Sequence, residues 1–297
     1  MMRMKRLAAL AALCAFVAGC ERAAEAPHAP ESAQVQDGIA VKPLSKWRYL
    51  QPSTVVDEQA AQEYSGLMAQ AQQKGALVPG DHPQVTRLRA IAKRMIPYAT
   101  RWNPEAAQWK WQVNLLNSAQ VNAFCMPGGR IAFFSGILTS LKLTDDEVAA
   151  VMGHEIAHAL REHGRERAAK STATGVVSRV IGAGVAAYTG IDPRITDTVA
   201  NMGGQLVVLK FSRDEEREAD LIGLDLAARA GFDPRAGVAL WRKMGALNKR
   251  EPVQLLSTHP GGEDRIAEIE NHMNVLLPLY ARSKGTSADT LPAYRVN

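Results

Sequence analysis

Cysteine is scarce in this chain of 297 residues, which contains three. We expect Cys14 to be removed with an N-terminal signal and Cys20 to carry lipid, on grounds given below. Cys125 then remains alone in the mature protein, so an intramolecular disulfide is excluded even in an oxidising compartment. Cys125 could be a redox-sensitive thiol, but a small buried apolar residue is the interpretation that we favour.

Apolar runs long enough to cross a membrane are also missing. The run at 7–18 has about 12 residues, and the run at 175–190 has 16 residues with Arg179 inside it. Both fall short of the ~20 residues that a membrane-spanning helix needs. Neither charge sign dominates, because the formal net charge is +5 and three of the basic residues lie within the first six positions. This charge balance gives no reason to expect a nucleic acid as a partner.

The N-terminus has the pattern of a secretory signal, in which basic residues precede an apolar run. The run ends at Val17-Ala18-Gly19-Cys20, which is similar to a bacterial lipobox. We therefore predict that residues 1–19 are removed and that Cys20 becomes the lipidated first residue, with an ordinary soluble signal peptide as the alternative. Several acyl chains on one cysteine suffice for stable anchoring. Glu21 follows in place of the aspartate associated with inner-membrane retention, so we expect the periplasmic side of the outer membrane rather than the inner membrane.

Residues 20–44 are rich in Ala, Pro, Glu and Gln and contain few large apolar side chains. Such a composition predicts a flexible tether without secondary structure. The whole chain has 46% hydrophobic and 22% charged residues, which is typical of a globular protein. We predict that residues 45–297 form one folded domain.

The segment His154-Glu155-x-x-His158 lies inside an apolar run that is compatible with a helix. Four residues separate the two histidines, so on a helix their imidazoles lie one turn apart on one face and can share a tetrahedral zinc ion. Glu155 lies about 100° further round the helix, beside the metal, where a general base for zinc-activated water is needed. Thr144 and Glu147 form a capping box that starts this helix. An exposed helix with two incidental histidines is the alternative.

Three glutamates on a second predicted helix, Glu215, Glu216 and Glu218, are candidates for a third metal ligand. Glu216 shares its helix face with Asp220 and with small residues, which allow that face to approach the histidine helix closely. We therefore choose Glu216 as the ligand. Asp220, one turn on, can accept the outer N–H of a zinc histidine and fix its tautomer. A solvated acidic helix start, favoured by the helix dipole, explains Glu215 and could explain Glu218.

The remaining periodicity predicts two helices and a small sheet. Apolar spacing predicts helices over 56–74 and 83–98, and alternation over 109–115 predicts a half-buried strand. Residues 121–126 and 130–134 have the pattern of a β-hairpin. A strand edge near a protease metal lets an extended substrate add as a further strand, whereas a purely structural hairpin is the alternative.

The segment after the histidine motif is first strongly charged and then apolar. Residues 161–167 are strongly charged, and we expect them to be solvated. His163 follows His158 by five residues, about 140° off its face by the helical period, so we do not expect it to bind the metal. Residues 171–210 are apolar but rich in Gly, Ala and Thr, and they predict a helical hairpin near the cleft.

Five short segments carry a resemblance to a known family: His154-Glu155-x-x-His158, Ser212-Arg213-x-x-Glu216-x-x-Ala219-Asp220, Thr258-His259-Pro260, Asn122-Ala123-Phe124 and Pro127-Gly128-Gly129. Together they resemble metallopeptidase family forty-eight, the HtpX-like zinc endopeptidases, from about residue 88 to 273. The resemblance implies a mainly α fold (α+β), a helical zincin-like domain with one small β-sheet beside the active-site helix. It also implies one catalytic zinc per chain and a substrate-binding role for Asn122, Ala123 and Phe124. The lack of membrane helices departs from HtpX itself, and with the lipobox the layout is similar to periplasmic lipoprotein proteases of the family.

His259 is the last histidine to which we assign a role. Pro260 disfavours helix at His259, and two glycines after it leave the segment free to move. The imidazole could donate an N–H to the oxyanion during turnover, or it could occupy the fourth position on zinc and exclude water. It could also merely cap the helix that starts near Glu263.

We therefore expect a zinc endopeptidase of the bacterial cell envelope, with Glu155 and His259 as catalytic residues. The expected substrates are unfolded, misfolded or misassembled envelope proteins. Further expected partners are the membrane, through lipid on Cys20, and the outer-membrane assembly machinery. The main alternative is a lipoprotein chaperone or assembly factor with little proteolysis, in which four protein ligands would close a structural zinc site. A surface-anchored binding module without metal is a third possibility.

Overall fold

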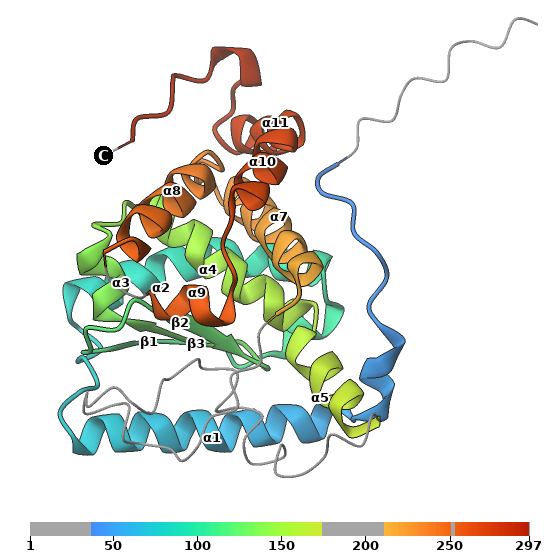
Figure 1. Cartoon of the computed structure of the whole chain (residues 1–297), viewed down its shortest axis with the longest axis vertical. Helices are drawn as coiled ribbons and strands as arrows, with labels where there is room; N and C mark the ends of the chain where they lie inside the picture. The colour runs from blue at the N-terminus through green and yellow to red at the C-terminus, as the bar shows by residue number, and fades with distance from the viewer. Residues whose placement is uncertain (1–36, 174–210, 251–252, 297) are drawn as a thin grey trace, which may run out of the picture. The chain divides into compact units, whose positions relative to one another are not determined.

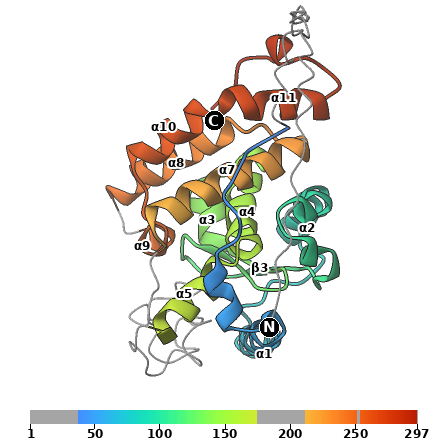
Figure 2. The same cartoon turned by 90° about the vertical axis from the view of Figure 1, so that its right-hand side faces the viewer.

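The computed structural model describes residues 37–173, 211–250 and 253–296. These residues belong to one compact unit, 36–297. Figures 1 and 2 show a mainly helical unit with one small sheet. The mainly α fold that the resemblance implied is therefore confirmed.

The helices account for most of the described chain. In chain order they are η1 (Lys46–Leu50), α1 (Ser53–Gln73), α2 (Pro83–Met95), η2 (Ile96–Arg101), η3 (Pro104–Gln108), α3 (Ser135–Ser140), α4 (Asp145–Leu160), α5 (His163–Ala173), α7 (Arg213–Arg229), α8 (Ala236–Asn248), α9 (Gln254–Thr258), α10 (Glu263–Asn271), α11 (Met273–Ser283) and η5 (Ala288–Thr290). The helices predicted over 56–74 and 83–98 correspond to α1 and to α2 with part of η2. Of the helical hairpin predicted at 171–210, residues 174–210 lie outside the described part of the chain.

The sheet contains β1 (Gln112–Leu116), β2 (Ala123–Met126) and β3 (Arg130–Phe134), in the order β1-β3-β2. β2 and β3 form the predicted antiparallel hairpin, and β1 runs parallel to β3. Gly128 and Gly129 in the hairpin turn have φ values of +77° and +80°, which glycine adopts without strain. The first strand is shorter than predicted, because η3 precedes it and the ladder begins only at Gln112.

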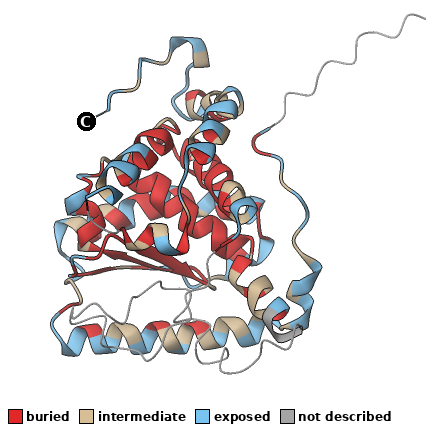
Figure 3. Cartoon of the chain, viewed as in Figure 1, coloured by how far each residue is buried: buried red, intermediate tan, exposed pale blue. Residues whose placement is uncertain are grey.

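Helices cover both faces of the sheet. Neighbouring strand residues point to opposite faces, so Ile131 and Phe133 join the core around α4, whereas Ala132 and Phe134 join the core around α1. Tyr64 of α1 closes the second core and donates its hydroxyl to the Ile131 carbonyl (2.6 Å). Figure 3 shows the sheet and α4 as the buried centre of the unit. One face of the sheet thus packs directly against α4.

Two glycines mark the contact between α4 and α7. A Cβ added to Gly153 would lie 2.4 Å from the Gly223 carbonyl oxygen, and a Cβ added to Gly223 would lie 2.5 Å from the Gly153 carbonyl carbon. Only glycine permits backbones to approach this closely. α4 begins with the predicted capping box of Thr144 and Glu147. The backbones of α4 and α7, which carry three of the four candidate ligands, are therefore in direct contact.

The N-terminal part of the described chain is bound to the unit from its first residues. The amide of Ile39 donates to Asp225 Oδ2 at 2.9 Å, and Arg161 donates to the Lys42 carbonyl at 2.6 Å. Fixed structure therefore starts before residue 45. Within the described residues, every helix is too short or too polar to cross a bilayer.

Candidate metal centre

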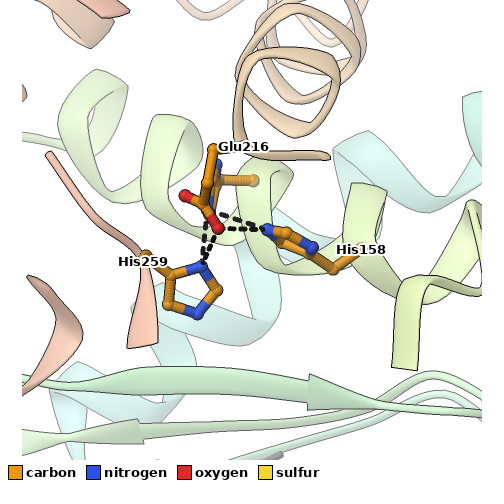
Figure 4. A group of neighbouring side chains, drawn as sticks. His158, Glu216 and His259 are labelled. Carbon is orange, nitrogen blue, oxygen red and sulfur yellow. Dashed lines mark hydrogen bonds and ion pairs between the residues drawn. The ribbon is translucent and has the colours of Figure 1, made fainter. Parts of the chain in front are cut away.

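Four buried side chains from three segments direct their donor atoms at one another. His154 and His158 lie on α4, Glu216 lies on α7, and His259 directly follows α9. One donor atom from each lies within 4.8 Å of the others, and each residue is at most 4% exposed. Figure 4 shows His158, Glu216 and His259 converging from separate parts of the chain. The structure thus brings together the two motif histidines, the chosen glutamate and the loop histidine.

The distances within this cluster fit a tetrahedral zinc site. His154 Nε2 lies 3.1 Å from both His158 Nε2 and His259 Nδ1. Glu216 Oε2 lies 3.5 Å from His154 Nε2, and Glu216 Oε1 lies 3.5 Å from His158 Nε2 and 2.9 Å from His259 Nδ1. Donors at ordinary zinc bond lengths of about 2.0–2.1 Å stand about 3.3 Å apart. Three imidazoles and one carboxylate also match the ligand preference of zinc.

Asp220 orients His154. Its Oδ1 lies 2.9 Å from His154 Nδ1. Burial favours the neutral acid, but Arg265 and His154 outweigh that effect and lower the pKa of Asp220. An ionised carboxylate can only accept a hydrogen bond, so Nδ1 of His154 carries the proton. The lone pair on His154 Nε2 therefore faces the other three donors.

Burial and charge also set the protonation of His158 and Glu216. Burial lowers the pKa of His158 well below its usual value, so this imidazole is neutral and able to bind a metal. Burial alone would raise the pKa of Glu216, yet the charge of His259 and the polar contacts with His158 and His259 lower it strongly. Glu216 is therefore an ionised carboxylate among nitrogen donors.

Arg265 is a central residue that the sequence did not reveal. Its guanidinium bridges both carboxylates of α7, with Nη1 2.6 Å from Glu216 Oε2 and Nε 2.6 Å from Asp220 Oδ2. It also stacks on Trp241, 3.7 Å from the ring centroid. In the sequence Arg265 sits in the charged start of α10 and looks solvated. Its burial depends on how α10 packs against α7 and α8, which no local pattern encodes.

Glu155 lies beside the donor cluster. Its Oε1 is 3.9 Å from His259 Nε2. Among the described residues this oxygen has no hydrogen-bond partner, although it is buried. Burial raises the pKa of Glu155 against the opposing effect of His259 and His154. A carboxylate of raised pKa, with one oxygen free of hydrogen bonds next to the donors, is suited to accept a proton.

The segment 161–167 differs from expectation. We predicted it to be solvated, but Arg161, His163 and Arg165 are buried. His163 is outside the donor cluster, yet its Nδ1 lies 2.9 Å from Nδ1 of His158. His163 is therefore not among the candidate metal donors, as expected, but it packs against His158 because α4 ends at Leu160 and the chain turns before α5 begins.

The proposed substrate-side residues are all buried. Asn122 accepts from the Phe134 amide, Ala123 begins β2, and Phe124 points into the core around α1. β2 is an edge strand, but the Leu255 amide donates to the Val121 carbonyl at 3.1 Å beside it. The carbonyl just before β2 is therefore already bound by α9.

His259 does not cap α10. Gly262 occupies the N-cap position of that helix, which has no side-chain cap, whereas the His259 ring faces Glu216 and His154. Phe211 stacks on the other side of the ring, with centroids 5.0 Å apart. His259 is therefore held among the metal donors in this structure.

Comparisons with known proteins agree on one family. The model of peptidase family M48 matches residues 83–273, which include all four donors and Glu155. Mitochondrial metalloendopeptidase OMA1 of Arabidopsis thaliana is 40% identical over 155 residues, covering 52% of this chain and 30% of that protein. OMA1 of Schizosaccharomyces pombe is 33% identical over 196 residues, covering 65% and 54%. The β-barrel assembly-enhancing protease of Escherichia coli is 31% identical over 179 residues, covering 57% and 36%. The chain spans between about a third and about half of the length of these relatives.

Proposed function

The chain belongs to peptidase family M48, and on that basis we propose that it is a zinc-dependent endopeptidase. The observation that supports this most strongly is the buried set of three histidines and Glu216, whose donor atoms fit one zinc ion. Glu155, with its unpaired oxygen beside the set, separates this site from a simple structural zinc site.

The chemistry follows from the placement of these groups. Bound zinc would supply Lewis acidity, which acidifies water and polarises a scissile carbonyl. Glu155 accepts a proton from the attacking water and passes it to the leaving amine. Asp220 keeps the proton of His154 on Nδ1, and Arg265 offsets the charge of the two α7 carboxylates. Burial of the site strengthens each of these electrostatic effects.

His259 controls access in this proposal. A catalytic zinc site keeps one position open, whereas four protein ligands close it. With His259 Nδ1 among the donors, the site as described is closed. We propose that His259 withdraws when substrate displaces the segment around α9. Once withdrawn, its imidazole can donate to the oxyanion.

The closed arrangement also favours a second candidate, a chaperone or assembly factor with little proteolysis. In that case zinc would only fix the contact of α4, α7 and the loop after α9. Such a site has no use for a buried carboxylate with an unpaired oxygen, which is the state of Glu155. We therefore rank the endopeptidase first.

We further propose that the protein acts on the periplasmic side of the outer membrane on unfolded or misassembled envelope proteins. The lipobox-like sequence ending at Cys20 supports this location, and Cys20 lies outside the described residues. The name of the Escherichia coli relative refers to β-barrel assembly, which agrees with the proposal, while the names of the OMA1 relatives refer to mitochondria.

The decisive experiment compares Glu155→Gln with the wild type on casein and on an unfolded porin. We expect the variant to keep one zinc per chain and its fold but to lose at least ~100-fold in turnover, the usual contribution of a general base. Glu58→Gln, the same change at an exposed position on α1, is the matched control and should behave as wild type. A chelator should abolish wild-type cleavage. Near-normal turnover by zinc-loaded Glu155→Gln would overturn the role assigned to Glu155, whereas a zinc-loaded wild type that cleaves neither substrate would leave the chaperone candidate.

A further inference from the structure

A second histidine stands directly behind the zinc ligand His158. His163 is 3% exposed, and its Nδ1 lies 2.9 Å from Nδ1 of His158, on the side of that ring away from the other donors. The two rings meet edge to face, with centroids 4.9 Å apart. His163 is not one of the four donors. It is placed to act on the metal through His158.

A break in the helix brings His163 to this position. Glu162 has φ of +55°, the left-handed region, which is uncommon for a residue other than glycine. It is held there by ion pairs with Arg48 and Arg165. A continuous helix would turn His163 away from His158, whereas the break returns it to the same side. Backbone strain that surrounding contacts maintain is a pointer to function.

The far side of His163 faces a carboxylate. Its Nε2 lies 3.0 Å from Glu218 Oε2, and the same oxygen accepts from Arg161 Nε at 3.0 Å. Glu218 on α7, His163 and His158 are therefore connected by two successive hydrogen bonds. The sequence allowed Glu218 to be a solvated residue at a helix start. That interpretation does not explain its contacts with His163 and Arg161.

The direction of the hydrogen bonds in this chain follows from its carboxylate end. An ionised carboxylate only accepts, so Nε2 of a neutral His163 carries the proton and donates to Glu218. Nδ1 of His163 is then an acceptor and takes the proton of His158 Nδ1. His158 Nε2 is left with its lone pair, directed at the other donors. The reverse direction would place a proton on His158 Nε2 and block its bond to a metal.

We propose that His163 is a positioning residue of the metal site, which together with Glu218 holds His158 in the tautomer that presents Nε2 to zinc. The inference deepens the proposed function and rests on the zinc site. The two ligand histidines are thus oriented differently: His154 directly by Asp220, and His158 through an intervening imidazole. α7 supplies the ligand Glu216 and both orienting carboxylates, Glu218 and Asp220.

The test measures the zinc dissociation constant by chelator competition, and the melting temperature of the metal-free protein beside it. His163→Leu removes both hydrogen bonds, and we expect zinc affinity to fall about 10–100-fold, the range for ligands that lose an orienting partner. His163→Gln keeps an acceptor for His158 and a donor for Glu218, so it should recover most of the affinity. The metal-free proteins should melt at similar temperatures. Equal zinc affinity in wild type and His163→Leu would overturn the proposal, as would failure of His163→Gln to recover any of the loss.

Glu218→Gln provides a second variant if His163→Leu does not fold. It preserves shape but removes the charge that sets the hydrogen-bond direction, and we expect affinity to fall about tenfold, the lower end of that range. Glu215→Gln is its control, because glutamine can replace glutamate in a capping box. Unchanged affinity in Glu218→Gln would also overturn the proposal. Wild-type protein that binds no zinc would instead refute the proposed function, so the two failures are distinct.

Discussion

At the residue scale, three neighbouring glutamates on α7 have three different surroundings. Glu216 faces the histidine donors and Arg265, Glu215 pairs with Arg167, and Glu218 contacts His163. The pKa of Glu215 is lowered, because hydrogen bonds from Arg167 and Ser212 outweigh its burial. Identical side chains thus serve as a candidate metal donor, as part of a half-buried ion pair and helix cap, and as a hydrogen-bond acceptor for His163.

We predict that Glu216→Ala releases zinc, whereas Glu215→Ala retains it. The first removes the only carboxylate that the described residues place in the donor cluster, and the second removes the third residue of the capping box, which lies outside the cluster. Zinc content after dialysis, measured by atomic absorption, checks both. Asp220→Ala should lie between them, with affinity reduced about 10–100-fold. Retention of a full equivalent of zinc by Glu216→Ala would contradict the ligand assignment.

We predict that His259→Ala keeps zinc and turns over unfolded substrate faster than wild type. Three donors remain, and the position that His259 occupies becomes available to water and substrate. Initial rates at saturating and subsaturating casein measure the change. A fall of about 10²–10³ would instead show that the oxyanion role dominates, and unchanged rates would rule out both roles.

At the element scale, the site depends on how closely α4 and α7 approach. These helices carry His154, His158 and Glu216, and their backbones touch at Gly153 and Gly223. The residue after α9, His259, adds the fourth donor, and α9 itself is bound to Val121, just before β2, through the Leu255 amide. The close contact fixes the spacing of the three donors on α4 and α7, whereas the fourth donor depends on the position of α9.

We predict that Gly153→Ala destabilises the protein by about 1–3 kcal/mol, the usual cost of forcing a methyl group into a packed contact. The added Cβ would meet the backbone of Gly223, which cannot yield as a side chain can. Gly245→Ala is the control, because nothing lies within 4 Å of a Cβ at this exposed position of α8. It should stabilise by about 0.5–1 kcal/mol through helix propensity. Urea unfolding measures both, and equal stability of the two variants would contradict the close-contact argument.

At the scale of the whole molecule, the described residues of the unit 36–297 include all four candidate donors. Residues 37–51 are bound along it, through Ile39 with Asp225 and through Arg165 with the Gln51 carbonyl. We therefore expect the proposed cleavage to be independent of the proposed lipid anchor, whose role would be to fix the location.

We predict that Cys20→Ala releases the protein from membranes and leaves peptidase activity in the soluble fraction. The change removes the acylated thiol but touches nothing in the described unit. Fractionation of cells, followed by casein cleavage in each fraction, checks the outcome. Membrane attachment that survives high salt and a carbonate wash would show that the anchor lies elsewhere in the chain.

Much of the local structure could be predicted from the sequence. Four-residue spacing placed His154 and His158 on one helix face, and the capping box at Thr144 placed the start of that helix. Both follow from backbone geometry and nearest neighbours, which are written into a short window of sequence. The glycines at the hairpin turn likewise allowed β2 and β3 to be predicted from a short window of sequence.

Only the tertiary structure reveals the contacts of residues whose partners are distant in the sequence. Arg265 and His163 look solvated in their own segments, yet one neutralises two carboxylates of α7 and the other backs a ligand of α4. A helical period cannot foresee the left-handed turn at Glu162, because that turn is held by Arg48 from another part of the chain. Whether His259 stands among the donors likewise depends on how α9 and α10 pack. Local sequence sets the candidate ligands, whereas long-range packing sets their protonation, their orientation and access to them.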